Sequence, residues 1–185
     1  MYDKNCDHCS LSKSRTQVVF GCGNASAKLV LIGEAPGEEE DKYGKPFWPQ
    51  AKCGSKIDSI LNYLEIKRED VYITNANLCR PPNNRTPNPE EIDACRKRLF
   101  DEIQKIRPQI IVCLGKTAYN SVFETDLKGR LKDLMFTSSK DVIVHSKFGS
   151  QIIVTYHPSY LIRRGKTATT EVLPQWEWIK NNLNT

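Results

Sequence analysis

The stretch that decides the fold is Lys28-Leu29-Val30-Leu31-Ile32-Gly33-Glu34-Ala35-Pro36-Gly37-Glu38-Glu39-Glu40-Asp41. Residues 28–32 have the composition of a buried β-strand, and the Gly-x-x-Pro-Gly that follows predicts a sharp turn at the strand's end. In open parallel sheets, ligands bind outside the carboxyl ends of the strands, so the four acids after the turn could reach a substrate. A run of charge is usually a solvated surface loop, which is the competing interpretation of these acids.

Length and composition predict one soluble globular domain. With 185 residues the chain can build one substantial core but not two ordinary domains, so we expect residues 1–185 to form a single unit. Charged residues make up 26% and hydrophobic residues 39%, which argues against disorder. We find no apolar run long enough for a membrane span and no signal-peptide core, so a secreted or membrane protein is not expected. The net charge of +5 favours a polyanionic partner.

Apolar runs alternate with helical patterns along the rest of the chain. Strands are expected at 71–75, 109–114 and 151–155, with a short one at 142–144, and helices at 54–64, 89–106, after 115–117, and at 173–183. The helix start at Asn88-Pro89-Glu90-Glu91 has a capping Asn, Pro at the first helical position and Glu three residues after the cap. This alternation predicts an α/β sandwich with a mainly parallel sheet.

Three of the predicted strands end in polar side chains. Glu34 follows the first strand, Asn75 ends the second, and His157 follows the last. Because the carboxyl ends of parallel strands share one edge of the sheet, these side chains are expected to line one pocket with an acid, an amide and an imidazole. Each residue alone has an ordinary explanation, such as an asparagine that forms a turn. Their convergence is the main evidence from the residues for a functional site.

Gly115-Lys116-Thr117, after the third strong strand, is similar to the end of a phosphate-binding loop. Such a loop requires a glycine five residues before Gly115, where this chain has Ile110. Nucleotide binding is therefore not expected.

The arrangement of the seven cysteines suggests ligands rather than disulfides. Thiols stay reduced in a cytosolic protein, where paired cysteines indicate a metal or cofactor. Cys6-x-x-Cys9 is such a pair, in a polar segment over residues 1–25 that a bound metal or cluster could hold in place. The partners of this pair should lie elsewhere in the chain.

Five motifs follow one another along the chain. They are Gly-Glu-Ala-Pro-Gly-Glu-Glu-Glu-Asp at 33–41, Gly-x-Pro-Phe at 44–47, Ile-Thr-Asn with Cys-Arg-Pro-Pro close behind at 73–82, Asn-Arg-x-Pro-x-Pro-Glu-Glu-Ile-x-Ala-Cys at 84–95, and His-Pro-Ser-Tyr-Leu at 157–161. Together in this order they resemble the family 4 uracil-DNA glycosylases, the iron–sulfur members of the uracil glycosylase superfamily. The resemblance implies a three-layer α/β/α sandwich around a four-stranded, mainly parallel sheet. It also implies monofunctional base excision, in which uracil is flipped out of DNA and its N-glycosidic bond is hydrolysed to leave an abasic site.

The resemblance further implies a [4Fe-4S] cluster, whose family cysteines correspond to Cys6, Cys9, Cys79 and Cys95. A thiolate-rich site also suits zinc, which the spacing alone leaves open. Cys22 is the most plausible rival ligand for one of the four positions, and His8, which sits between two cysteines, could also replace a ligand.

Two further cysteines and one loop depart from the ligand pattern. Cys113 is expected to be a small buried apolar residue within its strand. Cys53 falls where the family usually has no cysteine. It belongs to residues 46–54, a loop about two residues longer than the family's Pro-Phe-Val-Gly-x-Ala-Gly, so the base pocket is expected to be remodelled.

For the base, the resemblance implies that Phe47 stacks on flipped uracil, although a core aromatic is the alternative role for this residue. Asn75 is expected to accept from uracil N3–H and donate to O4, a pairing that cytosine does not offer. Backbone groups of Gly33 and Ala35 help to hold O2. His157 is expected to donate a hydrogen bond to O2 as negative charge gathers on the base.

Two acids, Glu34 and Glu40, could orient or polarise the attacking water. We expect Glu40 to handle the water and Glu34 to lie beside the base. No lysine is marked as a nucleophile, so simple hydrolysis without strand cleavage is expected.

The implied partner is uracil-containing DNA, single- or double-stranded, bound by a monomer in the cytoplasm or wherever that DNA is. The residues expected to contact the DNA are Arg80, Arg85, Ser159, Arg163, Arg164 and Lys166. Phosphate contacts position a protein without specifying sequence, so binding should weaken steeply with salt.

Two other functions stay open. The chain could keep the fold and cluster but bind DNA without turnover, although Phe47, Asn75 and His157 together argue against this. Alternatively, the altered loop could widen the pocket for other deaminated bases such as hypoxanthine or xanthine.

Overall fold

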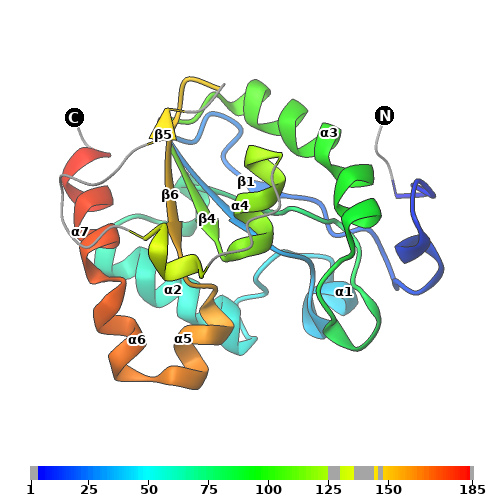
Figure 1. The fold of residues 1–185 in the computed structure, drawn as a ribbon, viewed down its shortest axis with the longest axis horizontal. Helices are drawn as coiled ribbons and strands as arrows, with labels where there is room; N and C mark the ends of the chain where they lie inside the picture. Colours follow the sequence, from blue (N-terminus) through cyan, green and yellow to red (C-terminus); the bar gives the residue numbers. More distant parts are fainter. Residues whose placement is uncertain (1–3, 125–129, 136–143, 146–147, 184–185) are drawn as a thin grey trace.

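The computed structural model describes residues 4–124, 130–135, 144–145 and 148–183 (Figure 1). One sheet runs through the middle of this part of the chain, and helices cover both of its faces. The predicted three-layer α/β/α arrangement is therefore confirmed. None of the helices in these ranges is both long enough and apolar enough to cross a membrane.

The sheet has a parallel centre and, within the described ranges, a short antiparallel strand at each edge. The parallel strands, in spatial order, are β3 (Tyr72–Asn75), β2 (Leu29–Gly33), β4 (Ile110–Leu114) and β6 (Gln151–Thr155). The edge strands are β1 (Cys22–Gly23), which pairs with β3, and β5 (Val144–His145), which pairs with β6. The four-stranded prediction is correct for the parallel centre and wrong for the total, because two-residue strands carry no periodic signal. Residues 142–143 of the expected short strand lie outside the described residues.

The helices predicted at 54–64, 89–106, after 115–117 and at 173–183 are present with shifted ends, whereas those at 38–43, 158–164 and 166–171 were not predicted. In chain order, the helices are α1 (Glu38–Tyr43), α2 (Lys52–Leu64), α3 (Pro89–Ile106), α4 (Lys116–Phe123), α5 (Pro158–Arg164), α6 (Lys166–Glu171) and α7 (Leu173–Asn182), with 3₁₀ turns at Ser10–Lys13, Arg68–Asp70, Pro82–Asn84 and Leu131–Asp133. The acids after the first turn are not a solvated loop but the helix α1, in which Glu40 and Asp41 are buried. The capping box expected at the start of α3 is present between Asn88 and Glu91.

Alternate residues of the central strands face opposite helical layers. Leu29 and Leu31 of β2 pack in one core cluster with residues of α2 and α7. Val30 and Ile32 pack in the other with residues of α3 and α4. Strands buried on both faces need apolar side chains on both, which is why residues 29–32 form a continuous apolar run.

Residues 4–19 of the N-terminal segment lie outside the sheet, next to the start of α3 (Figure 1). The buried carboxylate of Asp41 accepts hydrogen bonds from the backbone N–H groups of Thr16 and Gln17, at 3.0 Å and 3.3 Å. Leu11 and Leu78 form a small separate core with the neighbouring cysteines. Hydrogen bonds and this small core therefore hold a segment too polar to join the main core.

The strand register brings the expected site residues to one edge of the sheet. Gly33, the last residue of β2, is the direct partner of Asn75, the last residue of β3. The end of β4 is likewise level with the end of β6, since Leu114 pairs with Thr155. The turn after β2, the end of β3 and the start of α5 therefore meet at the carboxyl ends of the strands.

Candidate functional site

Asn75 lies at the floor of the site with an amide that no described residue satisfies. The residue is 1% exposed, and both its side-chain nitrogen and its side-chain oxygen are buried without a hydrogen-bond partner. A Cβ on the adjacent Gly33 would lie 2.2 Å from Asn75 Oδ1 and 2.7 Å from Cζ of Phe47, so only glycine fits there. A buried amide is normally hydrogen-bonded. The Asn75 amide therefore offers one donor and one acceptor at the end of β3.

Phe47 lies against the imidazole of His157 and, like Asn75, next to Gly33. Its ring is 1% exposed and its centroid lies 5.7 Å from that of the His157 ring. Its backbone is left-handed, with φ of 47°, a conformation that is costly for a non-glycine residue. Two side chains hold it there: Glu40 accepts the Phe47 N–H at 2.5 Å, and Arg68 donates to the Phe47 carbonyl at 2.5 Å. Strained backbone of this kind is typical of functional sites.

His157 is held as a neutral imidazole with a defined tautomer. Its Nδ1 accepts a hydrogen bond from the Ser159 backbone N–H at 3.3 Å, and Ser159 Oγ lies 3.0 Å from the same atom. Since Nδ1 is an acceptor, the proton of the neutral ring resides on Nε2. Burial, helped by the positive charge of Arg163, lowers the pKa of His157 to about 4. At neutral pH the ring is therefore an uncharged donor through Nε2.

An open cleft of about 620 Å³ lies beside these residues and includes His157. Of the residues predicted for the site, those that line it are Glu34, Ala35, Glu40, Arg85, His157, Ser159 and Arg163. The longer loop contributes as well, through Ala51 and Cys53. Phe47 and Asn75 are buried and do not line the cleft, so His157 is the residue that connects them to it.

The two candidate acids have different surroundings. Glu34 is half-buried, and its Oε2 accepts a hydrogen bond from Thr117 Oγ1 at 2.5 Å. Glu40 is buried, and its two oxygens accept from the backbone N–H groups of Gly37, at 2.7 Å, and Phe47. Burial raises the pKa of Glu40, and these two backbone hydrogen bonds oppose that rise. Glu40 therefore fixes the turn and the Phe47 backbone, and its role toward water stays a prediction.

The expected DNA contacts divide into two groups. Arg85 and Arg163 line the cleft, whereas Arg80, Arg164 and Lys166 are not part of its lining. Arg80 donates to Asn84 Oδ1 at 2.8 Å from the loop before α3. Arg164 ends α5 and Lys166 begins α6, both exposed at one side of the cleft-lining Arg163.

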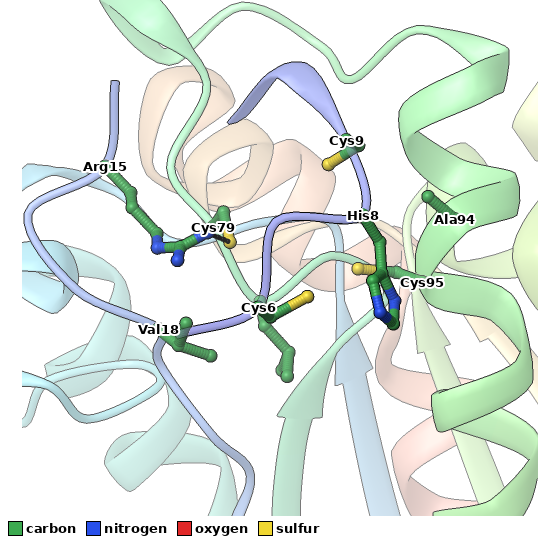
Figure 2. Close-up of a pocket in the computed structure, with 9 residues that line it drawn as sticks. Cys6, His8, Cys9, Arg15, Val18, Cys79, Ala94 and Cys95 are labelled. Carbon is green, nitrogen blue, oxygen red and sulfur yellow. Dashed lines mark hydrogen bonds between the residues drawn. The ribbon is translucent and has the colours of Figure 1, made fainter. Parts of the chain in front are cut away.

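Four cysteines share one small pocket beside the N-terminal segment. Figure 2 shows the side chains of Cys6, Cys9, Cys79 and Cys95 directed into a common space, and all four line the same pocket. Arg15 Nη1 donates to Cys79 Sγ at 3.4 Å. Burial raises the pKa of Cys79 to about 11 and also raises that of Cys9. Thiols in this setting hold their protons unless a metal replaces them.

The pocket offers sulfur ligands. Across the part of the chain that the structure describes, no three His, Cys, Asp or Glu side chains are placed to hold a metal ion directly. Four cysteines around one space nevertheless supply the donor set that iron–sulfur clusters use, and a structural zinc site uses the same donors.

The remaining cysteines are elsewhere. Cys22 pairs with Ile73 in the edge of the sheet and does not line the cysteine pocket, so the structure does not support it as the rival ligand. Cys113 is fully buried within β4, as predicted. Cys53 is half-buried in the wall of the cleft.

Several residues that shape the site escaped the sequence analysis. Arg98 is buried in α3, where its guanidinium donates to the backbone carbonyls of Asn75 and Ala76 at 2.8 Å and 2.7 Å. The sequence could have indicated that Arg98 is buried, because it lies three residues after Cys95 and next to Leu99, on the apolar face of the helix. A cation on the buried face of a helix calls for a buried acceptor nearby. Arg68 and Thr117 gave no comparable signal, because their partners are distant in sequence.

Comparison with known proteins agrees with this geometry. A family model described as the uracil DNA glycosylase superfamily matches residues 20–180. A type-4 uracil-DNA glycosylase of Thermotoga maritima is 44% identical to the chain over 160 residues, which cover 86% of this chain and 79% of that protein. Type-4 uracil-DNA glycosylases of Archaeoglobus fulgidus and Pyrobaculum aerophilum are 40% and 38% identical, over 86% and 87% of this chain and 79% and 81% of their own lengths. The chain therefore belongs to the uracil DNA glycosylase superfamily and, within it, to the type-4 uracil-DNA glycosylases.

Proposed function

We propose that this protein is a monofunctional uracil-DNA glycosylase that removes uracil from DNA and leaves an abasic site for base excision repair. The observation that carries the proposal is the buried, unpartnered amide of Asn75. It lies in contact range of an aromatic ring that also packs on a neutral histidine. Family membership and the names of the type-4 relatives support the same activity.

Asn75 supplies recognition of the base. Its Oδ1 can accept from uracil N3–H while its Nδ2 donates to O4, which satisfies both orphaned atoms at once. Cytosine has no proton on N3 and an amino group at position 4, so the same amide would face an acceptor with its oxygen and a donor with its nitrogen. A site built to hydrogen-bond one pattern rejects the other because buried polar groups are then left unpaired. Phe47 provides the flat apolar surface next to the amide.

His157 stabilises the leaving base. When the bond between C1′ and N1 breaks, its electron pair moves onto the uracil ring and negative charge develops at O2. The Nε2–H of a neutral imidazole donates to that oxygen, and its fixed tautomer needs no reorganisation during the reaction. Backbone groups of Gly33 and Ala35 in the adjoining turn assist at the same oxygen.

Glu34 is the better acid for water, in place of Glu40. One oxygen of Glu34 is anchored by Thr117 while both oxygens of Glu40 are engaged by backbone N–H groups. The carboxylate of Glu34 orients water toward C1′, stabilises positive charge on the sugar, and takes the proton when the new C1′–O bond forms. The sugar is then a hemiacetal at an abasic site, and uracil departs with the bonding electron pair.

Cys6, Cys9, Cys79 and Cys95 would hold a [4Fe-4S] cluster. When bound, the cluster would cross-link the N-terminal segment to the loop after β3 and to α3, and so brace one wall of the cleft. Arg15 adds a hydrogen bond to the Cys79 sulfur. Brown colour with absorbance near about 400 nm, together with iron and sulfide analysis, would distinguish this cluster from zinc. Replacing Cys95 with Ser is expected to remove the colour.

Uracil-containing DNA would be bound by a monomer. Arg85 and Arg163 in the cleft would contact phosphates beside the flipped nucleotide, and Ser159 would contribute from the same wall. Arg80, Arg164 and Lys166 would extend this contact beyond the cleft. These contacts position the strand and carry no sequence preference.

One experiment tests the activity and separates it from the alternatives. Duplexes with a single U·G, U·A or hypoxanthine·T pair are incubated with the protein, treated with alkali and run on a denaturing gel. Cleavage at uracil alone is expected, cleavage at hypoxanthine would indicate a pocket widened by the longer loop, and none would indicate a DNA-binding homologue. Borohydride is expected to trap no adduct, although Lys52 lines the cleft.

Two glutamine variants test the assignment of the acids. Glu34→Gln is expected to lower the single-turnover rate by about 100-fold or more with little change in DNA affinity. Glu40→Gln is expected to lower the melting temperature as well as the rate, because an amide NH₂ cannot accept a backbone N–H. A large rate loss in Glu40→Gln, with a melting temperature equal to that of wild type, would indicate that Glu40 and not Glu34 activates the water.

A further inference from the structure

The segment Gly115-Lys116-Thr117 lies against the catalytic groups, although it does not have the pattern for binding nucleotide. Thr117 is buried, and its Oγ1 donates to Glu34 Oε2 at 2.5 Å across 83 residues of sequence. Gly115 has φ of 98°, and a Cβ added to it would lie 3.4 Å from Cβ of His157. The start of α4 therefore contacts both the turn after β2 and the start of α5.

We propose that Thr117 is a positioning residue for the reaction, whose hydroxyl fixes the Glu34 carboxylate in the orientation that presents its other oxygen to the attacking water. This inference rests on the proposed uracil excision and on Glu34 as the acid that handles water. It gives the Gly115-Lys116-Thr117 segment a role that its likeness to a phosphate loop did not suggest.

The contacts around Glu34 fix its backbone and one oxygen and leave the second oxygen available. The Glu34 carbonyl accepts the Asn77 N–H at 3.0 Å, which ties the turn to the end of β3. Thr117 then holds Oε2. Within the described residues, no hydrogen bond or ion pair involves Glu34 Oε1. Glu34 is thus fixed at its backbone carbonyl and at Oε2, and this leaves Oε1 in a position to orient a water molecule.

The anchor matters because a glutamate side chain has three rotatable bonds. Without Thr117, the half-buried carboxylate of Glu34 could rotate within a cleft of about 620 Å³. A displacement of about 1 Å between reacting groups can reduce a rate by about 100-fold. A threonine hydroxyl is also neutral, so it orients the carboxylate without competing for the proton that the carboxylate accepts.

Thr117→Val tests the inference, because valine keeps the shape and removes only the donor. In single-turnover assays on a U·G duplex, the rate is expected to fall by about 10- to 100-fold, the range for losing a hydrogen bond to a charged group. Affinity for the same duplex should change by less than about twofold. Thr117→Ser, which keeps the hydroxyl, should restore the rate to within about threefold of wild type.

A matched control comes from the same helix. Ser121 Oγ donates to the Thr117 carbonyl at 2.9 Å, so Ser121→Ala removes a buried hydroxyl of α4 without touching Glu34. Its rate should equal that of wild type. The inference is overturned if Thr117→Val excises uracil at the wild-type rate, or if Thr117→Ser is as slow as Thr117→Val. A wild-type protein that does not excise uracil would instead overturn the proposed function.

Discussion

Asn75 is the residue whose energetics most clearly separate function from stability. Its side-chain nitrogen and oxygen are both buried without a partner in the described structure. An unsatisfied buried polar group costs about 1–3 kcal/mol relative to a satisfied one. Under the proposed function, a pyrimidine edge would satisfy the same two atoms, so this cost would serve recognition rather than stability.

Asn75→Leu is therefore expected to abolish uracil excision while leaving the melting temperature unchanged or higher. Leucine has a similar branched shape and removes two unsatisfied polar atoms from the interior. Asn77→Leu is the control, because Asn77 is equally buried but its Nδ2 donates to the Glu91 carbonyl at 2.7 Å. That variant should be destabilised by about 1–3 kcal/mol. Equal losses of stability in both variants, measured by thermal unfolding, would contradict this account.

His157 gives a prediction about pH. Its pKa in the folded protein is lowered to about 4, against about 6.5 in an unfolded chain. Between these values the unfolded chain binds a proton that the folded ring rejects, so this contribution to stability is complete above pH 6.5 and declines as pH falls toward 4. His157→Gln should lose that part of the pH dependence of unfolding.

Arg163→Gln should raise the pKa of His157, because the neighbouring positive charge contributes to lowering it. An NMR titration of the ring measures the change directly. Burial is the larger cause, so most of the shift should remain in the variant. A ring that titrates near its ordinary value in the wild type would mean that the imidazole is charged when it meets the base.

At the scale of elements, the start of α3 joins the cysteine pocket to the cleft. Glu91 completes the capping box with Asn88, accepts from Ser10 of the N-terminal segment at 2.7 Å, and pairs with Arg85 of the cleft at 2.7 Å. Its side chain is 1% exposed. One carboxylate thus connects a helix start, the segment that bears Cys9, and an arginine of the proposed DNA surface.

Glu91→Ala is expected to lower the free energy of unfolding by about 2–3 kcal/mol, because it removes several hydrogen bonds to a charged group and a helix cap. The melting temperature should fall by about 5–10 °C. Glu90→Ala, in the same first turn but exposed, should change little. Equal melting temperatures for the two variants would show that the network around Glu91 contributes nothing.

Low pH is expected to weaken the stabilisation that Glu91 provides. Hydrogen bonds from Arg85, from the Asn88 N–H and from Ser10 lower the pKa of Glu91 to about 2, against an ordinary value of 4.5. The stabilisation is therefore present above pH 4.5 and declines as pH falls toward 2. The stability difference between wild type and Glu91→Ala should shrink over that range.

At the scale of the whole molecule, the charge distribution predicts how DNA binding responds to salt. The chain carries a net charge of +5, and two arginines line the cleft. If the protein contacts about four phosphates, a plot of the logarithm of the DNA-binding constant against the logarithm of the salt concentration should have a slope of about −3 to −4. Arg163→Gln should reduce that slope by about 1. Lys180→Gln, with the same change of charge on distant α7, should leave it unaltered.

Much of the fold was predictable because its signals are local. The buried strands of the parallel centre are apolar runs, and the capping box fixed the start of α3. The edge strands were not predictable, since β1 and β5 have two residues each and exist only through pairing with a neighbour. The helix α1 was missed because its acids look solvated, although Asp41 and Glu40 are held by backbone N–H groups from other segments.

By itself, the sequence determined the four parallel strands, the helices α2, α3, α4 and α7, and the polar residues at three strand ends, and its motifs indicated the cysteines that share a pocket. Periodicity, capping and motifs are visible in residues that are near one another in the chain. Only the tertiary structure decided that Thr117 holds Glu34, that both oxygens of Glu40 accept backbone N–H groups, and that the Asn75 amide has no partner among the described residues. Those facts depend on contacts between residues up to 83 positions apart, and a hydrogen bond across the fold leaves no trace in local sequence.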